Sequence, residues 1–274
     1  MSGARCARLA DGRLHLQHGP IEVLIECWGQ RDEVEAAYLQ ARRRFGTILE
    51  ELVAELRCLR RPVNGSYPDF EGKVARRMTA AVWPHRGVFV TPMAAVAGSV
   101  ADELMEALIQ GRALSKACVN DGGDIALHLA PGEAITVGIV DDPARPQIDA
   151  EVRVRAADRA RGVATSGWRG RSQSLGIADA VTVLAHNAAA ADAAATLVAN
   201  AVNLDHPAIR RRPAREVKED TDLGELPVTV GVDALPENAV MEALRRGLAT
   251  AAAMKRVGLL EAAYLSLQGR AVAC

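Results

Sequence analysis

The side chains most capable of chemistry gather in three short segments that are otherwise built from small residues. The segments are Val119-Asn-Asp-Gly-Gly-Asp-Ile125, Val163-Ala-Thr-Ser-Gly-Trp-Arg-Gly-Arg171 and Ala191-Asp-Ala-Ala-Ala-Thr196. A plain apolar core excludes such polar groups unless they are paired, and small residues let the backbone approach a ligand closely. The three segments together predict a site for a small phosphorylated molecule.

The first segment offers Asn120, Gly122, Gly123 and Asp124 as ligand-binding residues. A glycine turn between two apolar runs brings backbone groups and a carboxylate to the same place. The same residue types are common in tight hairpin turns, which is the purely structural interpretation. The sequence leaves both interpretations open.

The second segment combines hydroxyl, amide and guanidinium groups. The turn Thr165-Ser166-Gly167 carries two hydroxyls and free backbone N–H groups. Arg169 and Arg171 follow, and a guanidinium can hold a phosphate or a carboxylate through two parallel hydrogen bonds. Arginines are also common on any protein surface, so ordinary surface charge is the alternative.

The third segment places Asp192 and Thr196 four residues apart, which puts both side chains on one face of a helix. Such a pair can hold a metal ion or a polyphosphate. An Asp near a helix N-terminus also complements the helix dipole, so a structural role for Asp192 is the alternative. The catalytic residues stay unassigned.

Apolar spacing predicts a mixture of helices and strands around these segments. Alternation over 13–28 indicates a hairpin, and strands are expected at 116–119, 125–129, 134–140, 151–156, 181–185 and 228–232, with 259–272 returning to the sheet. Helical periodicity covers 31–60, 70–82, 94–110, 188–202 and 236–256. The charged, proline-containing run 210–226 is predicted to be a loop. Without a regular βαβ alternation, this order indicates an α+β fold.

Composition limits the class of protein. The 274 residues include 33 basic and 34 acidic ones and only 3% aromatics, which argues against nucleic-acid binding. No apolar run approaches membrane-spanning length. Five scattered cysteines and a polar N-terminus indicate a cytoplasmic protein. The apolar stretches 91–107 and 188–202 are expected to be buried within the protomer, and a homodimer through another surface stays open.

Five motifs in series resemble the ApbE superfamily, whose best-known members are FAD:protein FMN transferases that use Mg²⁺ to move FMN from FAD to a protein threonine. The motifs lie within 88–203 and are Met93-Ala-Ala-Val-Ala-Gly-Ser-Val-Ala-Asp102, Val119-Asn-Asp-Gly-Gly-Asp-Ile125, Val137-Gly-Ile-Val-Asp-Asp-Pro143, Val163-Ala-Thr-Ser-Gly167 and Ala191-Asp-Ala-Ala-Ala-Thr196. The resemblance implies one ApbE-like α+β domain over 1–274, with mixed and antiparallel sheets and packed helices in two coupled halves around a cleft. The N- and C-terminal portions diverge and resemble an uncharacterised branch of the superfamily.

The resemblance also implies ligands. By this likeness Asp192 and Thr196 hold Mg²⁺ together with a backbone carbonyl from 94–98, and FAD or another phosphorylated heterocycle lies near 120–124 and 165–167. Two departures stand out. The transferases usually carry a Lys where this chain has Ala97, and a His-containing segment ending in Asp-Pro where this chain has Arg169 to Asp179 without either.

These departures predict a divergent protein that binds a flavin, a pterin or another phosphorylated small molecule and transfers FMN weakly or not at all. Three alternatives stay open: a Mg²⁺-dependent FAD:protein FMN transferase, an enzyme in the biosynthesis of a pterin-type C1 carrier such as tetrahydromethanopterin, and a non-catalytic metabolite-binding protein. In each the expected partner is a small molecule, not a nucleic acid or a membrane.

Overall fold

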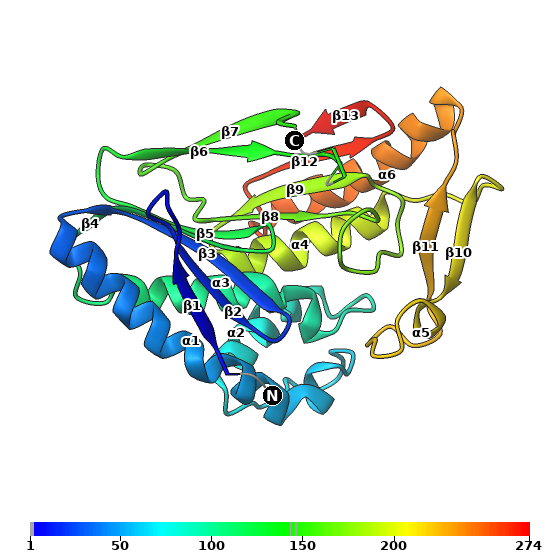
Figure 1. Cartoon of the computed structure of the whole chain (residues 1–274). Coiled ribbons are helices and arrows are strands. Elements are labelled where there is room, and N and C mark those ends of the chain that lie inside the picture. Colours follow the sequence, from blue (N-terminus) through cyan, green and yellow to red (C-terminus); the bar gives the residue numbers. More distant parts are fainter. Residues whose placement is uncertain (1–2, 143, 146) are drawn as a thin grey trace.

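One antiparallel sheet of nine strands runs through the computed structural model, which describes residues 3–142, 144–145 and 147–274 (Figure 1). The strand order is β1-β2-β3-β4-β5-β8-β9-β12-β13. The strands are β1 (Arg5–Arg8), β2 (Leu14–His18), β3 (Ile21–Gly29), β4 (Leu114–Asp121), β5 (Asp124–Leu129), β8 (Gly162–Ser166), β9 (Ala180–Ala185), β12 (Ala262–Leu267) and β13 (Arg270–Ala273). Two separate hairpins complete the strands: β6 (Ala134–Ile139) with β7 (Ala150–Arg155), and β10 (Ile209–Pro213) with β11 (Pro227–Val232).

The longer helices divide between two cores, one for each half of the sheet. The first core joins β2–β5 to α1 (Arg31–Leu59), α2 (Lys73–Val82) and α3 (Val96–Ile109). The second joins β8, β9 and β12 to α4 (Ala188–Ala201) and α6 (Glu237–Arg256). Short turns of helix lie at Trp83–His85, Pro92–Ala95 and, as α5, Ala214–Val217. The predicted α+β class with antiparallel sheets is confirmed.

The two halves of the sheet meet at a narrow junction. Strands β5 and β8 pair only through Ile125 with Val163 and Ala126 with Gly162. By contrast, β4 and β5 pair through six residues each. Two backbone pairs supply few hydrogen bonds, so the halves need further connections between their helices.

Helices α3 and α4 supply that connection by capping each other. The carboxylate of Asp102, on α3, accepts hydrogen bonds from the backbone N–H groups of Ala188 (3.0 Å) and Ala189 (2.9 Å) at the start of α4. In return Asp192, on α4, accepts from the N–H of Gly98 (3.0 Å) at the start of α3. These N–H groups have no partner within their own helices, so each carboxylate satisfies donors that would otherwise be orphaned.

A glycine makes this close approach feasible. A Cβ added at Gly98 would lie 2.3 Å from the carbonyl oxygen of Ala188, well inside van der Waals contact. Alanines on α4 extend the same close packing, since ten of its residues, mostly alanines, are buried. The prediction that the apolar helices over 91–107 and 188–202 are buried is therefore confirmed.

Most predicted elements are present, and one prediction is wrong. The run 210–226, predicted to be a loop, contains strand β10 and the short helix α5. Charge and proline indicated a loop, but Arg210 and Arg212 point outward from a two-stranded ribbon whose partner is β11. Strands β1 and β8 are additional to the predicted set. Within the described residues, no helix is both long and apolar enough to cross a membrane.

Replacing Asp102 with Ala should lower the free energy of unfolding by about 1–3 kcal/mol, because two buried N–H groups at the start of α4 lose their acceptor. Asp102→Asn should lose less, since one amide oxygen can still accept. Urea unfolding followed by circular dichroism measures both changes. Equal stability of the Ala variant and the parent chain would contradict the capping role.

Candidate functional site

Three aspartates lie together where the two halves of the sheet meet. Asp121 and Asp124 face each other across the β4–β5 hairpin, and Asp192 on α4 interacts electrostatically with both. Side chains alternate along a strand, so Asp121 shares a face with the core residues Ala117 and Val119. That face is the one that α3 and α4 cover. The side chain of Asp192 is thus turned toward the 121–124 hairpin turn.

Burial and mutual repulsion make these carboxylates hard to ionise. Burial, opposed in part by Arg171, raises the pKa of Asp121 to about 7, and this side chain is only 5% exposed. Burial also raises the pKa of Asp192 to about 7, with a further contribution from Asp121. Burial, Asp192 and Asp121 together hold the pKa of Asp124 well above its ordinary value. Such crowding of like charges is costly unless a cation balances it.

Backbone N–H groups hold each carboxylate in place. Asp192 receives the N–H groups of Gly98 and Ala97 at the start of α3. The N–H of Thr165 reaches Asp124, just beyond the last β5–β8 backbone pair. Asp192 and Asp124 nevertheless keep part of their surface accessible to solvent. Backbone hydrogen bonds thus hold these two carboxylates, and neither is fully enclosed.

Gly122 and Gly123 form the two-residue turn between β4 and β5, and the aspartates on either side of it belong to the cluster. Gly122 and Gly123 both have positive φ angles, of 65° and 112°, as the favoured hairpin turns require. The side chain of Asn120 accepts a hydrogen bond from the N–H of Gly123 at 2.8 Å. Asn120 therefore has a structural partner within the turn, as the structural interpretation expects.

The predicted turn at Thr165-Ser166-Gly167 is wrong, because Thr165 and Ser166 pair with β9 as the last residues of strand β8. Their side chains alternate between the two faces of the sheet. The hydroxyl of Thr165 pairs with that of Thr182 at 2.8 Å, on the face opposite the carboxylates. Of Thr165, only the backbone N–H reaches the cluster, where it hydrogen-bonds to Asp124. Ser166, next along β8, alternates onto the same face as Ala164, which packs against α4. Packing explains why position 167 is a glycine, because a Cβ there would lie 2.2 Å from the carbonyl oxygen of Asp179.

The two arginines of this segment have different roles. Arg169 donates to Asp179 at 2.7 Å and its guanidinium carbon lies 4.9 Å from the centre of the Trp168 ring, so internal contacts account for it. Arg171 lies over the hairpin turn, close enough that a Cβ at Gly122 would clash with its guanidinium. Its charge lowers the pKa of both Asp121 and Asp124. Arg171 is thus the cation of this segment that faces the cluster.

The donor set fits a small divalent cation only together with other oxygens. In the described part of the chain no three acidic, histidine or cysteine side chains converge on a single point at ligand distance. Mg²⁺ in proteins is commonly held by one or two carboxylates, with waters and substrate phosphates completing six oxygens. Asp192 and Asp124 would supply the carboxylates here, and Thr196 lies one helical turn after Asp192 on α4. The residues present therefore fit such an ion.

Two carboxylates were not among the predicted site residues. Asp121 is the carboxylate opposite Asp124, and the alternation Ala117, Val119, Asp121 on the buried face of β4 is a signal that could have revealed it. Asp102 lies 86 residues before its partner Ala188. No local pattern could have revealed that contact.

Comparison with known proteins agrees with the fold and the motifs, which define an ApbE-like α+β protein. The chain matches the family described as AbpE bacteria over residues 6–273, and it belongs to that family. It is 35% identical over 150 residues to a UPF0280 protein of Methanopyrus kandleri, covering 54% of this chain and 57% of that one. It is 40% identical over 114 residues to a UPF0280 protein of Methanococcus vannielii, covering 40% and 45%. The chain thus spans about half the length of these curated relatives.

Two solved structures are similar at low sequence identity. The ApbE protein of Thermotoga maritima gives a TM-score of 0.44 at 14% identity, covering 74% of this chain and 88% of that chain. The flavinyl transferase ApbE of Pseudomonas stutzeri, in its apo form, gives 0.45 at 12% identity, covering 99% and 93%.

Removing one charge from the cluster should stabilise the cation-free protein at high pH. The folded-state pKa values are raised, so the unfolded chain releases these protons first as the pH increases. The stability that the cluster contributes is therefore fully present below about pH 4 and is lost as the pH rises to about 7. Asp124→Asn should raise the free energy of unfolding at pH 8 by about 1 kcal/mol, and the gain should vanish near pH 4.

Thermal unfolding in EDTA across this pH range tests the expectation. Asp205→Asn, which removes a carboxylate from an exposed loop position, is the matched control and should change little. A stability loss for Asp124→Asn at pH 8 would show that its charge is already balanced within the protein.

Proposed function

We propose that this protein binds a phosphorylated heterocycle of the flavin class through a divalent cation at the aspartate cluster, and that it is an enzyme divergent from FMN transferases. The observation that carries the proposal is the group of three crowded carboxylates beside Arg171, two of which, Asp124 and Asp192, keep part of their surface accessible to solvent. A fold that needed only stability would not keep such a cluster. Membership of the ApbE-like family supports the ligand class.

Each residue has a role in this proposal. Asp192 and Asp124 hold the cation, with Thr196 on the same side of α4 as Asp192. Arg171 binds the phosphate through its planar guanidinium. Ser166 and the glycine turn at 122–123 lie on the surface that the ligand approaches. When bound, the cation would balance the carboxylates and polarise a phosphoryl oxygen.

The same residues argue against efficient FMN transfer. Ala97 supplies only its backbone N–H to Asp192, where the resemblance leads to a lysine. The stretch from Arg169 to Asp179 contains no histidine. Asp179 is engaged structurally, accepting from Trp168 and Arg169 and from the N–H of Gln268. This segment therefore stabilises the loop after β8 and contributes no general acid or base.

Binding of FAD should depend on Mg²⁺ and on the cluster. We expect flavin fluorescence titrations to show binding with Mg²⁺ that weakens at least about tenfold with EDTA or in Asp192→Asn, because the phosphate then loses its cation. Asp192→Asn keeps an oxygen for the N–H of Gly98, so the helix contact survives. Lys255→Met, an exposed change on α6, is the control. Binding that is indifferent to Mg²⁺ and to Asp192→Asn would contradict the proposal.

Arg171→Lys should also weaken FAD binding by about tenfold while preserving the charge, because an ammonium group cannot make the two parallel hydrogen bonds of a guanidinium. Arg169→Lys is the matched comparison. Its guanidinium serves Asp179 inside the protein, so this change should affect stability more than affinity. The opposite pattern, with Arg169 controlling affinity, would assign the phosphate to the other arginine.

Incubation with FAD, Mg²⁺ and a flavinylation-acceptor peptide should yield little or no covalent flavin, because general acid–base assistance commonly contributes about 10²–10⁴-fold to rate. Mass spectrometry of the peptide measures the outcome. Release of FMN or AMP without peptide labelling would indicate a related hydrolytic activity. Robust labelling would contradict the proposed divergence.

A further inference from the structure

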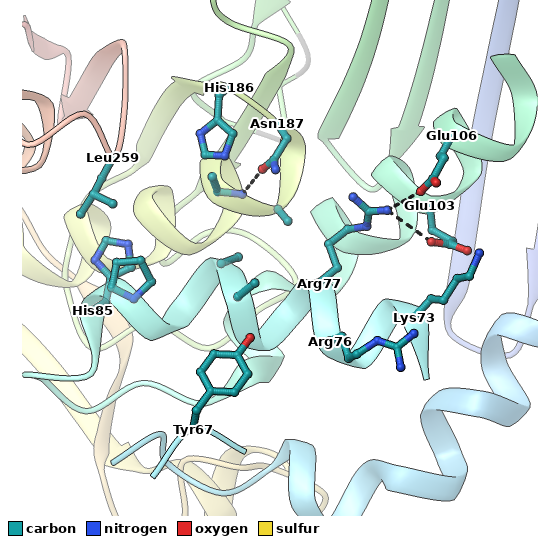
Figure 2. Close-up of a pocket in the computed structure, with 15 residues that line it drawn as sticks. Tyr67, Lys73, Arg76, Arg77, His85, Glu103, Glu106, His186, Asn187 and Leu259 are labelled. Carbon is teal, nitrogen blue, oxygen red and sulfur yellow. Dashed lines mark hydrogen bonds and ion pairs between the residues drawn. The ribbon is translucent and has the colours of Figure 1, made fainter. Parts of the chain in front are cut away.

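A cavity that is separate from the aspartate cluster lies at the start of α4. It has a volume of about 560 Å³ and is lined by α2, by Glu103 and Glu106 of α3, and by the first residues of α4 (Figure 2). None of the aspartates of the cluster, nor Arg171, lines it. Cavities of this size hold molecules as large as a nucleotide.

The cavity has two chemically different ends. Figure 2 shows the rings of Tyr67, His85 and His186 at one end and the side chains of Lys73, Arg76 and Arg77 toward the other. Tyr67 is held edge-on against Trp83, with ring centres 5.0 Å apart. Burial lowers the pKa of His85, which favours the neutral form of its ring. One end thus offers planar aromatic rings, and the other offers the positive charges of Lys73 and Arg76 beside the ion pairs of Arg77.

The unused hydrogen-bonding groups of the cavity are mainly donors. Lys73 makes no ion pair with any residue that the structure describes. The Nε of Arg77 is buried without a hydrogen-bond partner in the described structure. The acidic groups, by contrast, are already engaged: Glu106 and Glu103 accept from Arg77, and Glu103 also accepts from Arg44 at 2.7 Å. Unsatisfied donors favour a ligand rich in acceptors, such as an anion.

The backbone N–H groups at the starts of α4 and α2 are not available to bind an anion in the cavity. The first N–H groups of α4 are occupied by Asp102 and by Asn187. Glu55 accepts from the N–H groups of Glu71 and Gly72 just before α2. An anion in the cavity would therefore be held by side chains, chiefly Lys73 and Arg76.

We propose that this cavity is a binding site for a planar heteroaromatic monophosphate, with the ring against Tyr67 and the histidines and the phosphate at Lys73 and Arg76. Arg76 directs one guanidinium nitrogen to the carbonyl oxygens of Glu71 and Phe70 (3.0 and 3.4 Å), which orients the group. Because the ligand would contact the first turn of α4, it would bind directly beside the helix that carries Asp192.

Isothermal titration calorimetry with AMP in EDTA tests this site, since chelation removes the cation on which the aspartate cluster depends. AMP should bind, and adenosine and inorganic phosphate should each bind at least about tenfold more weakly. Lys73→Met and Tyr67→Ala should each weaken AMP binding by about tenfold, while Lys255→Met should have no effect. Circular dichroism spectra and melting temperatures confirm that each variant is folded.

Three results would overturn the proposal. Equal affinities for AMP and adenosine would mean that the basic end plays no part. AMP binding unchanged by both cavity variants, or no binding at all, would remove the site. Loss of AMP binding in Asp124→Asn with retention in Lys73→Met would place the ligand at the aspartate cluster. These results are distinguishable from failure of the proposed function, which is tested with FAD and Mg²⁺.

Discussion

Reciprocal capping between α3 and α4 is the contact on which the rest of the structure depends. The first turns of the two helices lie against each other. Asp102 of α3 caps the start of α4, and Asp192 of α4 caps the start of α3. Gly98 permits this because any larger residue would strike the backbone of α4. The sheet alone joins its halves through two residue pairs of β5 and β8. The helix contact therefore fixes how the hairpin at 121–124 and the helix bearing Asp192 meet.

The two capping carboxylates differ in what they leave free. Both oxygens of Asp102 are occupied by N–H groups of α4, and the residue is buried. Asp192 uses one oxygen for Gly98 and stays accessible beside Asp124. One carboxylate is thus committed to the fold, whereas the other serves the fold and remains available to a ligand. Retaining crowded charges at such a place is a common trade of stability for function.

Several features followed from the sequence because their signals are local. Helical periodicity predicted α1, α3, α4 and α6, and the glycine pair predicted the hairpin turn. The spacing of Asp192 and Thr196 placed both on one side of α4. The strands that the sequence analysis did not predict depend on pairing with strands far away in the sequence. Strand β8 is five residues long and is defined by its neighbours β5 and β9, and β10 is a strand only because β11 pairs with it.

The same reasoning explains the candidate sites. Arg169 and Arg171 are hard to tell apart in sequence, because they flank the same glycine, Gly170, in one loop. Only the positions of Asp179 and Gly122 separate an internal ion pair from a cation that faces the cluster. The cavity beside α2 joins residues from four separate parts of the chain, so no motif describes it.

A crystal structure of the protein soaked with Mn²⁺ and FAD would test the central claim most directly. Mn²⁺ replaces Mg²⁺ at oxygen sites and is located by its anomalous scattering. The account predicts an anomalous peak in contact with the carboxylates of Asp192 and Asp124, with a phosphate of the flavin nucleotide between the ion and Arg171. A peak at another position, or flavin bound with its phosphates away from these carboxylates, would contradict it.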